Sequence, residues 1–257
     1  MVVGDPLIRR VSVRVSVDRV EEARAVMLEL FPEGFEEVDV EGELELAAYT
    51  SAAGEERLWQ VFGSGATRDV PTGWADAWKR FHRPTRIGRL WVGPPWEDPP
   101  ADVISVVIDP GRAFGTGSHP TTRLSLGLLL RLAPSSLVDL GCGSGVLAIA
   151  AARLGFDPVI AIDTDEDAVA ATRANAAVND VHVDVRHGDV LRDVLPATDV
   201  AVANITVGDA ETVAARVASG TLITSGYLAS EQLQLSGWEQ TKRREANGWA
   251  ADLFARL

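Results

Sequence analysis

The stretch Val138 to Gly145, VDLGCGSG, decides the fold of this chain. Its three glycines follow a short apolar run, and glycine allows both a sharp backbone turn and a close approach of the backbone to a ligand. A segment of helical length continues from Val146 to Leu154, and the free amide groups at the start of a helix face such a ligand. The spacing therefore predicts a strand, a ligand-binding turn and a helix.

A second apolar strand, Val159 to Ile162, delivers Asp163 twenty-two residues after Gly141. A carboxylate at about this distance accepts hydrogen bonds from the two hydroxyls of a ribose. The dinucleotide fingerprint G-x-G-x-x-G would require glycine where Val146 stands, and the P-loop pattern G-x-x-x-x-G-K-[ST] is absent from the sequence. The spacing favours an adenosine-bearing cofactor; the alternative is an ordinary glycine-rich turn in another α/β domain.

Composition predicts a cytoplasmic protein. No apolar run approaches the roughly 18 residues that cross a bilayer, so no membrane span is expected. Arginines interrupt the N-terminal segment MVVGDPLIRRVSVRVSV, which therefore lacks the apolar core of a signal peptide. The single cysteine, Cys142, allows neither an intrachain disulfide nor a cysteine-based zinc site, and the histidines lack metal-ligand spacing, so no metal is expected.

The chain is acidic, with a formal net charge of −13, and residues 1–70 contain 15 acidic residues and 7 arginines. An acidic protein repels phosphate backbones, so direct binding of nucleic acid is not expected. A basic protein substrate would instead be attracted. The charge serves solubility equally well, and composition alone leaves both interpretations open.

Three parts are predicted along the 257 residues. Residues 1–66 alternate as β-α-β-β-α-β, with Asp18 as the cap of the first helix, which predicts a small ferredoxin-like α+β domain. Residues 67–102 are dense in proline and glycine and predict a linker with one short helix, Trp74 to Phe81. Residues 103–257 alternate strands and helices, which predicts a parallel sheet with helices on both faces and a final antiparallel hairpin.

A second motif, Asp109 to Arg123, reads DPGRAFGTGSHPTTR and combines flexible glycines with many hydrogen-bonding side chains. The D-x-G-x-G-x-G pattern with its downstream acid is similar to motif one of the class I S-adenosyl-L-methionine methyltransferases. With the loop, VDLGCGSGVLAIAA, AIDTDEDAV and VANI, the sequence closely resembles the bacterial ribosomal protein L11 methyltransferase family, PrmA. The linker sequence GWADAWKRFHRPTRIG resembles the family more weakly.

The resemblance implies a Rossmann-like class I fold with a seven-stranded sheet, and S-adenosyl-L-methionine as the cofactor. It implies methylation of the α-amino group and lysine side chains of a basic ribosomal protein, held by the small first domain. We expect a monomer. Cofactor contacts are expected, from the family's positions, its loop, the glycine turn and class I enzymes in general, at the following residues: Thr116, Thr122, Gly141, Gly143, Asp163, Asp189 and Asn204.

Two residues are candidates for the catalytic step. Asn204 lies in NITVGDAE, which lacks the proline of the N-P-P-aromatic motif found in methylases of planar nitrogens, and this suits a flexible amine. Its oxygen could accept a hydrogen bond from that amine, or Asn204 could merely cap a turn. His119 could relay a proton, or hold the loop through a hydrogen bond.

Two other functions remain open from the sequence. The cofactor pocket would serve a methyltransferase of a small molecule or nucleic acid equally well. The chain could also be a catalytically silent module that binds the cofactor and holds a partner protein through its first domain.

Overall fold

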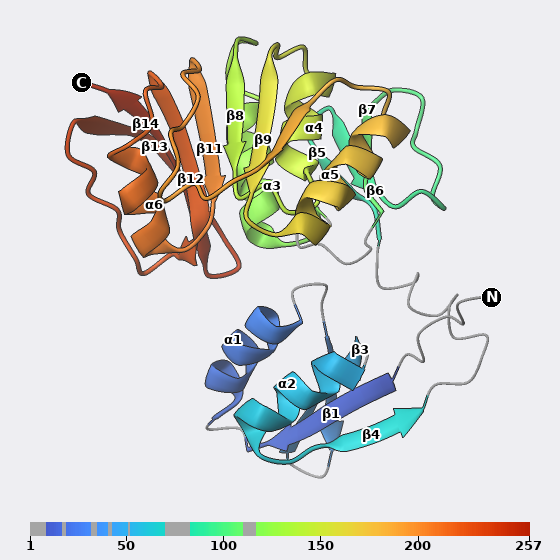
Figure 1. The fold of residues 1–257 in the computed structure, drawn as a ribbon. Coiled ribbons are helices and arrows are strands. Elements are labelled where there is room, and N and C mark those ends of the chain that lie inside the picture. Colours follow the sequence, from blue (N-terminus) through green and yellow to red (C-terminus); the bar gives the residue numbers. More distant parts are fainter. Residues whose placement is uncertain are drawn as a thin grey trace. The chain divides into compact units, whose positions relative to one another are not determined.

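The structure of the chain is a computed structural model. It describes residues 9–16, 19–31, 35–40, 43–50, 52–69, 83–109 and 117–257. The chain divides into two compact units, Met1–Phe81 and His82–Leu257 (Figure 1). The expected linker helix, Trp74 to Phe81, and the expected cap Asp18 lie outside the described residues. The part of the chain that the structure describes contains no helix long and apolar enough to span a membrane.

The first unit is a four-stranded antiparallel sheet with the strand order β2-β3-β1-β4 and two helices. This is the predicted ferredoxin-like arrangement. β1 is central because its valines, Val11 and Val13, are buried against the helices. Its elements are β1 (Arg9–Val15), α1 (Val20–Leu30), β2 (Glu36–Val40), β3 (Glu43–Thr50), α2 (Ala52–Phe62) and β4 (Ala66–Asp69).

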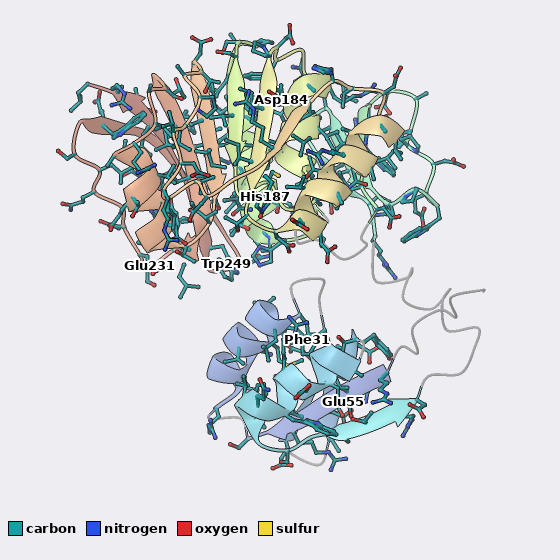
Figure 2. The ribbon with its side chains drawn as sticks, viewed as in Figure 1. Phe31, Glu55, Asp184, His187, Glu231 and Trp249 are labelled. Atoms are coloured by element: carbon teal, nitrogen blue, oxygen red, sulfur yellow. The ribbon has the colours of Figure 1, made fainter. Side chains whose placement is uncertain are left out.

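The core of the first unit is small. Phe31, directly after α1, and Leu58, on α2, are fully buried there. Figure 2 labels Phe31 within this unit. Its buried hydrophobic cluster, among the described residues, consists of Val11, Val13, Ala23, Met27, Phe31, Leu46, Ala48 and Leu58. A core of this size makes the unit marginal on its own.

The segment predicted as a linker contains regular structure. β4 extends to Asp69 and pairs with β1, three residues beyond the expected domain end at position 66. β5 (Thr85–Ile87) and β6 (Leu90–Gly93) form a hairpin, and β6 pairs in parallel with β7 (Ile104–Val107). The hairpin forms because Leu90, Trp91 and Val92 are buried while Gly88, at φ 57°, makes its turn.

A seven-stranded sheet with the order β10-β9-β8-β11-β12-β14-β13 forms the centre of the second unit. Its first five strands are parallel, and β14 returns antiparallel to β12 and pairs with β13. The predicted class I sheet and its final hairpin are confirmed. The strands are β8 (Leu137–Leu140), β9 (Val159–Asp163), β10 (Asp184–His187), β11 (Val200–Asn204), β12 (Thr221–Leu228), β13 (Trp238–Ala246) and β14 (Trp249–Arg256).

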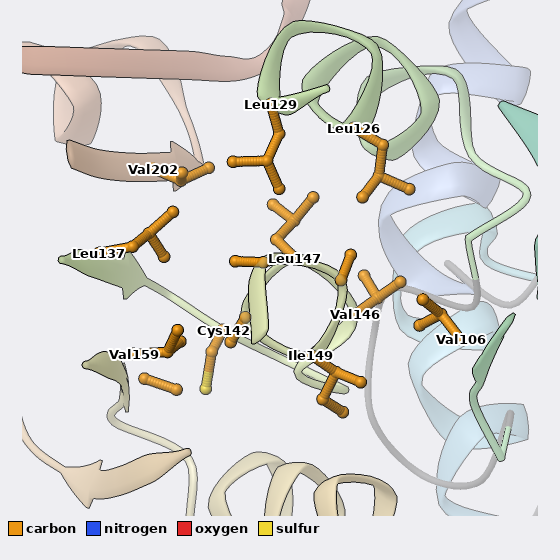
Figure 3. Packing of buried hydrophobic residues seen from close by; sticks show 14 of the residues in the cluster. Val106, Leu126, Leu129, Leu137, Cys142, Val146, Leu147, Ile149, Val159 and Val202 are labelled. Atoms are coloured by element: carbon orange, nitrogen blue, oxygen red, sulfur yellow. The ribbon is translucent and has the colours of Figure 1, made fainter. Parts of the chain in front are cut away.

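Alternating side chains bury both faces of this sheet, as expected for a parallel sheet between helices. Leu137 and Val159 point to one cluster, which includes helices α3 and α4 (Figure 3). Val138 and Ile160 point to the opposite cluster, which includes α6. The helices of this unit are α3 (Pro120–Leu129), α4 (Val146–Arg153), α5 (Glu166–Val178) and α6 (Val207–Ala214).

Candidate cofactor and acceptor site

The predicted site residues gather where parallel strands end. β8 leads into Gly141, β9 ends at Asp163, β10 at His187 and β11 at Asn204. Figure 2 shows Asp184 and His187, the first and last residues of β10, at opposite edges of the sheet, so His187 marks the carboxyl edge. Ligands of open α/β sheets bind outside this edge, at the point where the strand order reverses, here between β8 and β11.

The glycine turn takes the conformation that the sequence predicts. Gly141, Gly143 and Gly145 have φ of 79°, 54° and 81°, which side-chain-bearing residues rarely adopt. The space beside two of them is filled by the protein. An added Cβ would lie 2.7 Å from Ile205 Cγ2 at Gly141 and 2.6 Å from Thr172 Cγ2 at Gly145. These two glycines therefore serve internal packing as well as any approach of a ligand.

Asp163 joins the turn to β9. Its Oδ2 accepts a hydrogen bond from the Gly143 amide at 2.8 Å, and its Oδ1 accepts one from the Asp165 amide at 3.0 Å. A carboxylate has about four acceptor positions, so these two bonds leave acceptor capacity for two ribose hydroxyls. The carboxylate predicted as the ribose acceptor is thus fixed against the predicted glycine turn.

Two further ionisable groups of the turn are buried. Burial raises the pKa of Asp139 to about 7, although its Oδ2 accepts a hydrogen bond from the Ala148 amide at 3.1 Å. Burial also raises the pKa of the Cys142 thiol to about 12, so this thiol stays protonated. Cys142 lies 3.4 Å from Thr172 Oγ1 and behaves as a packed turn residue.

A buried polar stripe, consisting of Thr172 and Asn175 on α5 and its C-cap residue Asn179, lies against the turn. Thr172 donates to the Gly143 carbonyl at 2.9 Å, and Asn175 Nδ2 donates to the Ser144 carbonyl at 2.9 Å. The sequence analysis missed these residues. The sequence pattern that could have indicated them is a polar residue at positions i, i+3 and i+7, which lie on one face of a helix; here that face is buried.

The same stripe reaches the end of β7. Asn175 Oδ1 accepts from the Asp109 amide at 3.1 Å. Asn179 accepts from the Val107 amide at 2.7 Å and donates to the Val107 carbonyl at 2.6 Å. The beginning of the loop motif and the glycine turn are therefore bonded to one helix face.

Two predicted cofactor contacts leave a buried polar atom unpaired within the described part of the chain. These atoms are Thr122 Oγ1 on α3 and Asn204 Oδ1 at the end of β11. Buried polar atoms in native proteins are nearly always hydrogen-bonded, to protein or to another group. The two atoms fit a site for a polar cofactor and a polar substrate, and Ser125 Oγ and Asp139 Oδ1 also lack a partner among the described residues.

His119 is the N-cap of α3. Its Nδ1 accepts from the Thr121 amide at 3.3 Å and lies 2.7 Å from Thr121 Oγ1, and its ring packs edge-on against Trp249 at 4.9 Å. Burial lowers the pKa of His119 to about 4. The ring is therefore neutral at pH 7, which favours the loop-stabilising alternative; the proton relay stays a prediction.

Two predicted cofactor contacts remain, Asp189 and Thr116. Asp189 follows β10 in a turn, where its Oδ1 accepts from the Leu191 amide at 2.9 Å and its carboxylate lies 3.5 Å from Arg192. Its predicted contact with adenine stays a prediction. Thr116 lies outside the described residues. In the part of the chain that the structure covers, no three His, Cys, Asp or Glu side chains form a potential metal site.

The sequence model described as "Ribosomal protein L11 methyltransferase (PrmA)" matches residues 22–255 of this chain. The chain belongs to this family. A crystal structure of ribosomal protein L11 methylase from Lactobacillus delbrueckii subsp. bulgaricus is similar at a TM-score of 0.60 and 27% identity, over 68% of this chain and 99% of that chain. The class I fold predicted from the glycine turn is that of this PrmA relative.

Curated PrmA relatives bear the name ribosomal protein L11 methyltransferase. The protein from Oceanobacillus iheyensis is 40% identical over 200 residues, which are 69% of this chain and 62% of the relative. The protein from Aeromonas hydrophila is 43% identical over 196 residues, which are 68% of this chain and 65% of the relative. The matched segment thus spans less than two thirds of the length of these relatives.

Proposed function

We propose that this chain transfers a methyl group from S-adenosyl-L-methionine to amino groups of a basic ribosomal protein of the L11 type, at its α-amino group and lysine side chains. Membership of the PrmA family supports this proposal. The observation that carries it is the Asp163 carboxylate, bonded to the amide of Gly143 in the glycine turn and retaining acceptor capacity.

The residues present fit the proposed cofactor. Asp163 would accept hydrogen bonds from the ribose hydroxyls, Thr122 Oγ1 offers an unpaired polar atom, and the turn at Gly141 and Gly143 would face the ligand with backbone groups. When bound, the cofactor supplies the methyl group and the electrophilic chemistry. The protein supplies orientation and a polar environment.

Asn204 would orient the acceptor amine. Its buried Oδ1 lacks a partner among the described residues, and an amide oxygen accepts the hydrogen bond that an incoming amine donates. The amine must lose a proton before it can attack. An α-amine, with an ordinary pKa near 8, loses it more readily at neutral pH than lysine, with a pKa near 10.4. We therefore expect the α-amine to react without a strong base.

The substrate side of the proposal depends on charge. The acidic first part of the chain would attract a basic protein and repel nucleic acid, and we assign substrate holding to residues 1–66 on this ground. We further propose a cytoplasmic monomer. The two rivals are a methyltransferase of a small molecule or nucleic acid and a silent cofactor-binding module.

Calorimetry with S-adenosylmethionine and its demethylated product tests the cofactor. Asp163→Ala should weaken binding by about 1–3 kcal/mol, because two ribose hydroxyls lose their acceptor. Asp184→Ala, an exposed aspartate at the opposite edge of the same sheet, is the control and should bind normally. Tight binding of a nicotinamide dinucleotide, or unchanged affinity in Asp163→Ala, would contradict the proposal.

Transfer of a labelled methyl group to purified ribosomal protein L11 tests the activity and its acceptor. We expect kcat/KM to rise with pH toward the pKa of the amine, and Asn204→Ala to lower turnover more than it weakens cofactor binding. Added salt should slow the reaction because it screens charge steering beyond about 10 Å at 0.1 M. Labelling of RNA or a small molecule instead of the protein would support the first rival. Binding without transfer would support the second.

A further inference from the structure

Ile205, the residue after Asn204, lies between two glycines, one in the turn after β8 and one in β12. On one side, a Cβ added to Gly141 of the turn would lie 2.7 Å from Ile205 Cγ2 and, among the described residues, within 4 Å of no other side chain or distant backbone. On the other side, a Cβ added to Gly226 of β12 would lie 2.2 Å from the Ile205 carbonyl oxygen. Real Cβ atoms do not approach backbone as closely as at Gly226, and at Gly141 the clash is with the branched side chain of Ile205. The turn and β12 therefore both need glycine where they meet Ile205.

A bulge in β12 creates the second contact. The register between β12 and β14 shifts between Ser225 and Tyr227, and Gly226 has φ of 107°. The Ile205 amide donates to the Ser225 carbonyl at 3.0 Å, and Ser225 Oγ donates to the Ala250 carbonyl at 2.7 Å. The bulge is thus bonded to Ile205 on one side and to β14 on the other.

The chain is also fixed directly after Ile205. Thr206 is the N-cap of α6, where its hydroxyl donates to Asp209 Oδ2 at 2.8 Å and accepts from the Asp209 amide at 3.4 Å. Directly before Ile205, Asn204 is in register with Ser225 at the end of β11. Asn204 therefore has little freedom to move independently of Ile205.

We infer that Ile205 is a positioning residue for methyl transfer. It is held between Gly141 and Gly226. It thereby sets the distance between the glycine turn and Asn204, whose oxygen is proposed to accept a hydrogen bond from the substrate amine. The inference rests on the proposed function, because Asn204 matters only if an amine is methylated. Displacing Ile205 should move Asn204 and the substrate amine that it orients, while Asp163 and its contacts with the ribose stay in place.

Gly226→Ala tests the inference through the split between turnover and cofactor binding. The new methyl group must push the Ile205 backbone away, and misplacement by about 1 Å costs up to about a hundredfold in rate. We expect kcat to fall about tenfold to a hundredfold, with the Kd of S-adenosylhomocysteine within about threefold of the original. A folded Gly226→Ala enzyme with full kcat, or with cofactor affinity lost in proportion to kcat, would overturn the inference.

Gly237→Ala is the matched control. Gly237 has φ of 80°, so alanine causes a similar backbone strain there, yet no atom of the described residues outside its chain neighbours lies within 4 Å of the added Cβ. This variant should keep its kcat. Ile205→Ala should lower kcat, and Ile205→Val, which retains the Cγ2 that faces Gly141, should lower it less. Equal losses in the two Ile205 variants would contradict the packing role of that methyl group.

A double-mutant cycle tests the contact without any activity. Gly141→Ala introduces backbone strain in every background, but its clash with Cγ2 exists only while Ile205 is present. The loss of Tm caused by Gly141→Ala should therefore be smaller in an Ile205→Ala background. Equal losses would disprove the contact. If the unmodified chain transfers no methyl group, the proposed function fails, and this cycle still decides whether Ile205 occupies the space between the glycines.

Discussion

The two units use polar side chains in different ways. The first unit joins its helices and strands through arginine–carboxylate pairs at partly exposed positions, such as Arg10 with Glu45 at 2.7 Å and Arg24 with Glu37 at 2.7 Å. The second unit buries Thr172, Asn175 and Asn179 completely or nearly so and bonds them to backbone. Exposed pairs contribute about 0–1 kcal/mol each, whereas a buried group deprived of its partner costs about 1–3 kcal/mol. The second unit is therefore built to hold backbone atoms in place.

Removing one large buried ring from each unit should have the largest effect. Phe31→Ala and Phe254→Ala each delete a buried phenylalanine and should each cost about 3–5 kcal/mol. The buried cluster of the first unit contains eight of the described residues, so we expect Phe31→Ala to unfold this unit while the second unit stays folded. Hydrogen exchange read by mass spectrometry would resolve the two units. Loss of protection in both units of Phe31→Ala would show that the two units unfold as one cooperative structure.

Asn179→Leu probes the buried polar groups of the second unit. The substitution retains the approximate volume but leaves the amide and carbonyl of Val107 without their partners, so we expect a loss of about 2–4 kcal/mol. Asn179→Asp, which keeps one acceptor for the amide, should lose part of this amount. Chemical denaturation would measure both. A loss below about 1 kcal/mol for Asn179→Leu would place these bonds in the same class as the surface pairs.

The second unit should also lose stability as the pH rises from about 4 to about 7. Burial raises the pKa of Asp139 to about 7, above the value of about 3.9 in an unfolded chain. A raised carboxyl pKa stabilises the fold fully below the unfolded value, and this contribution is lost as the pH rises through about 7. Asp139→Asn should remove that loss. Tm measured between pH 4 and 8 would show it, and an identical dependence of Tm on pH in the two proteins would refute the assignment.

The first unit should respond in the opposite direction, with the smallest effect. The hydrogen bond from Arg10 lowers the pKa of Glu45, so the stabilisation is present above the unfolded value near 4.3 and is lost as the pH falls through the folded pKa. Glu45→Gln should cost at most about 1 kcal/mol at pH 7 and should reduce the acid sensitivity of the first unit. Denaturation at pH 7 and pH 4 would test this. If the acid sensitivity of the first unit did not change in Glu45→Gln, other carboxylates would be its cause.

Local sequence patterns predicted most of the fold. The glycine turn, the parallel strands and the final hairpin follow from apolar runs and from glycine spacing within a few residues. The β5–β6 hairpin was missed because its buried run, Leu90 to Val92, is only three residues long among prolines and glycines. Short runs of this kind carry no periodicity that distinguishes a strand from a linker.

The candidate site was only partly predictable for a different reason. Asp163 and Gly143 come from two adjacent motifs, so spacing brought them together. Asn175 and Asn179 resemble an exposed helix face in the sequence, and their partners lie 66 and 72 residues away. The contact of Ile205 with two glycines requires three strands in their final order, which no local pattern contains.

The amide of Asn179 also has a consequence for the outer edge of β7. β7 is the last strand of its three-stranded sheet, and the Val107 amide and carbonyl both bond to Asn179. A side-chain amide offers the same donor and acceptor as a peptide group, so Asn179 takes the place of a neighbouring strand at this residue. Exposed edges are templates for aggregation, and natural sheets protect them with helices or loops. Here the C-cap residue of α5 closes the edge at Val107, which leaves no free hydrogen-bonding pair there for a strand from another molecule.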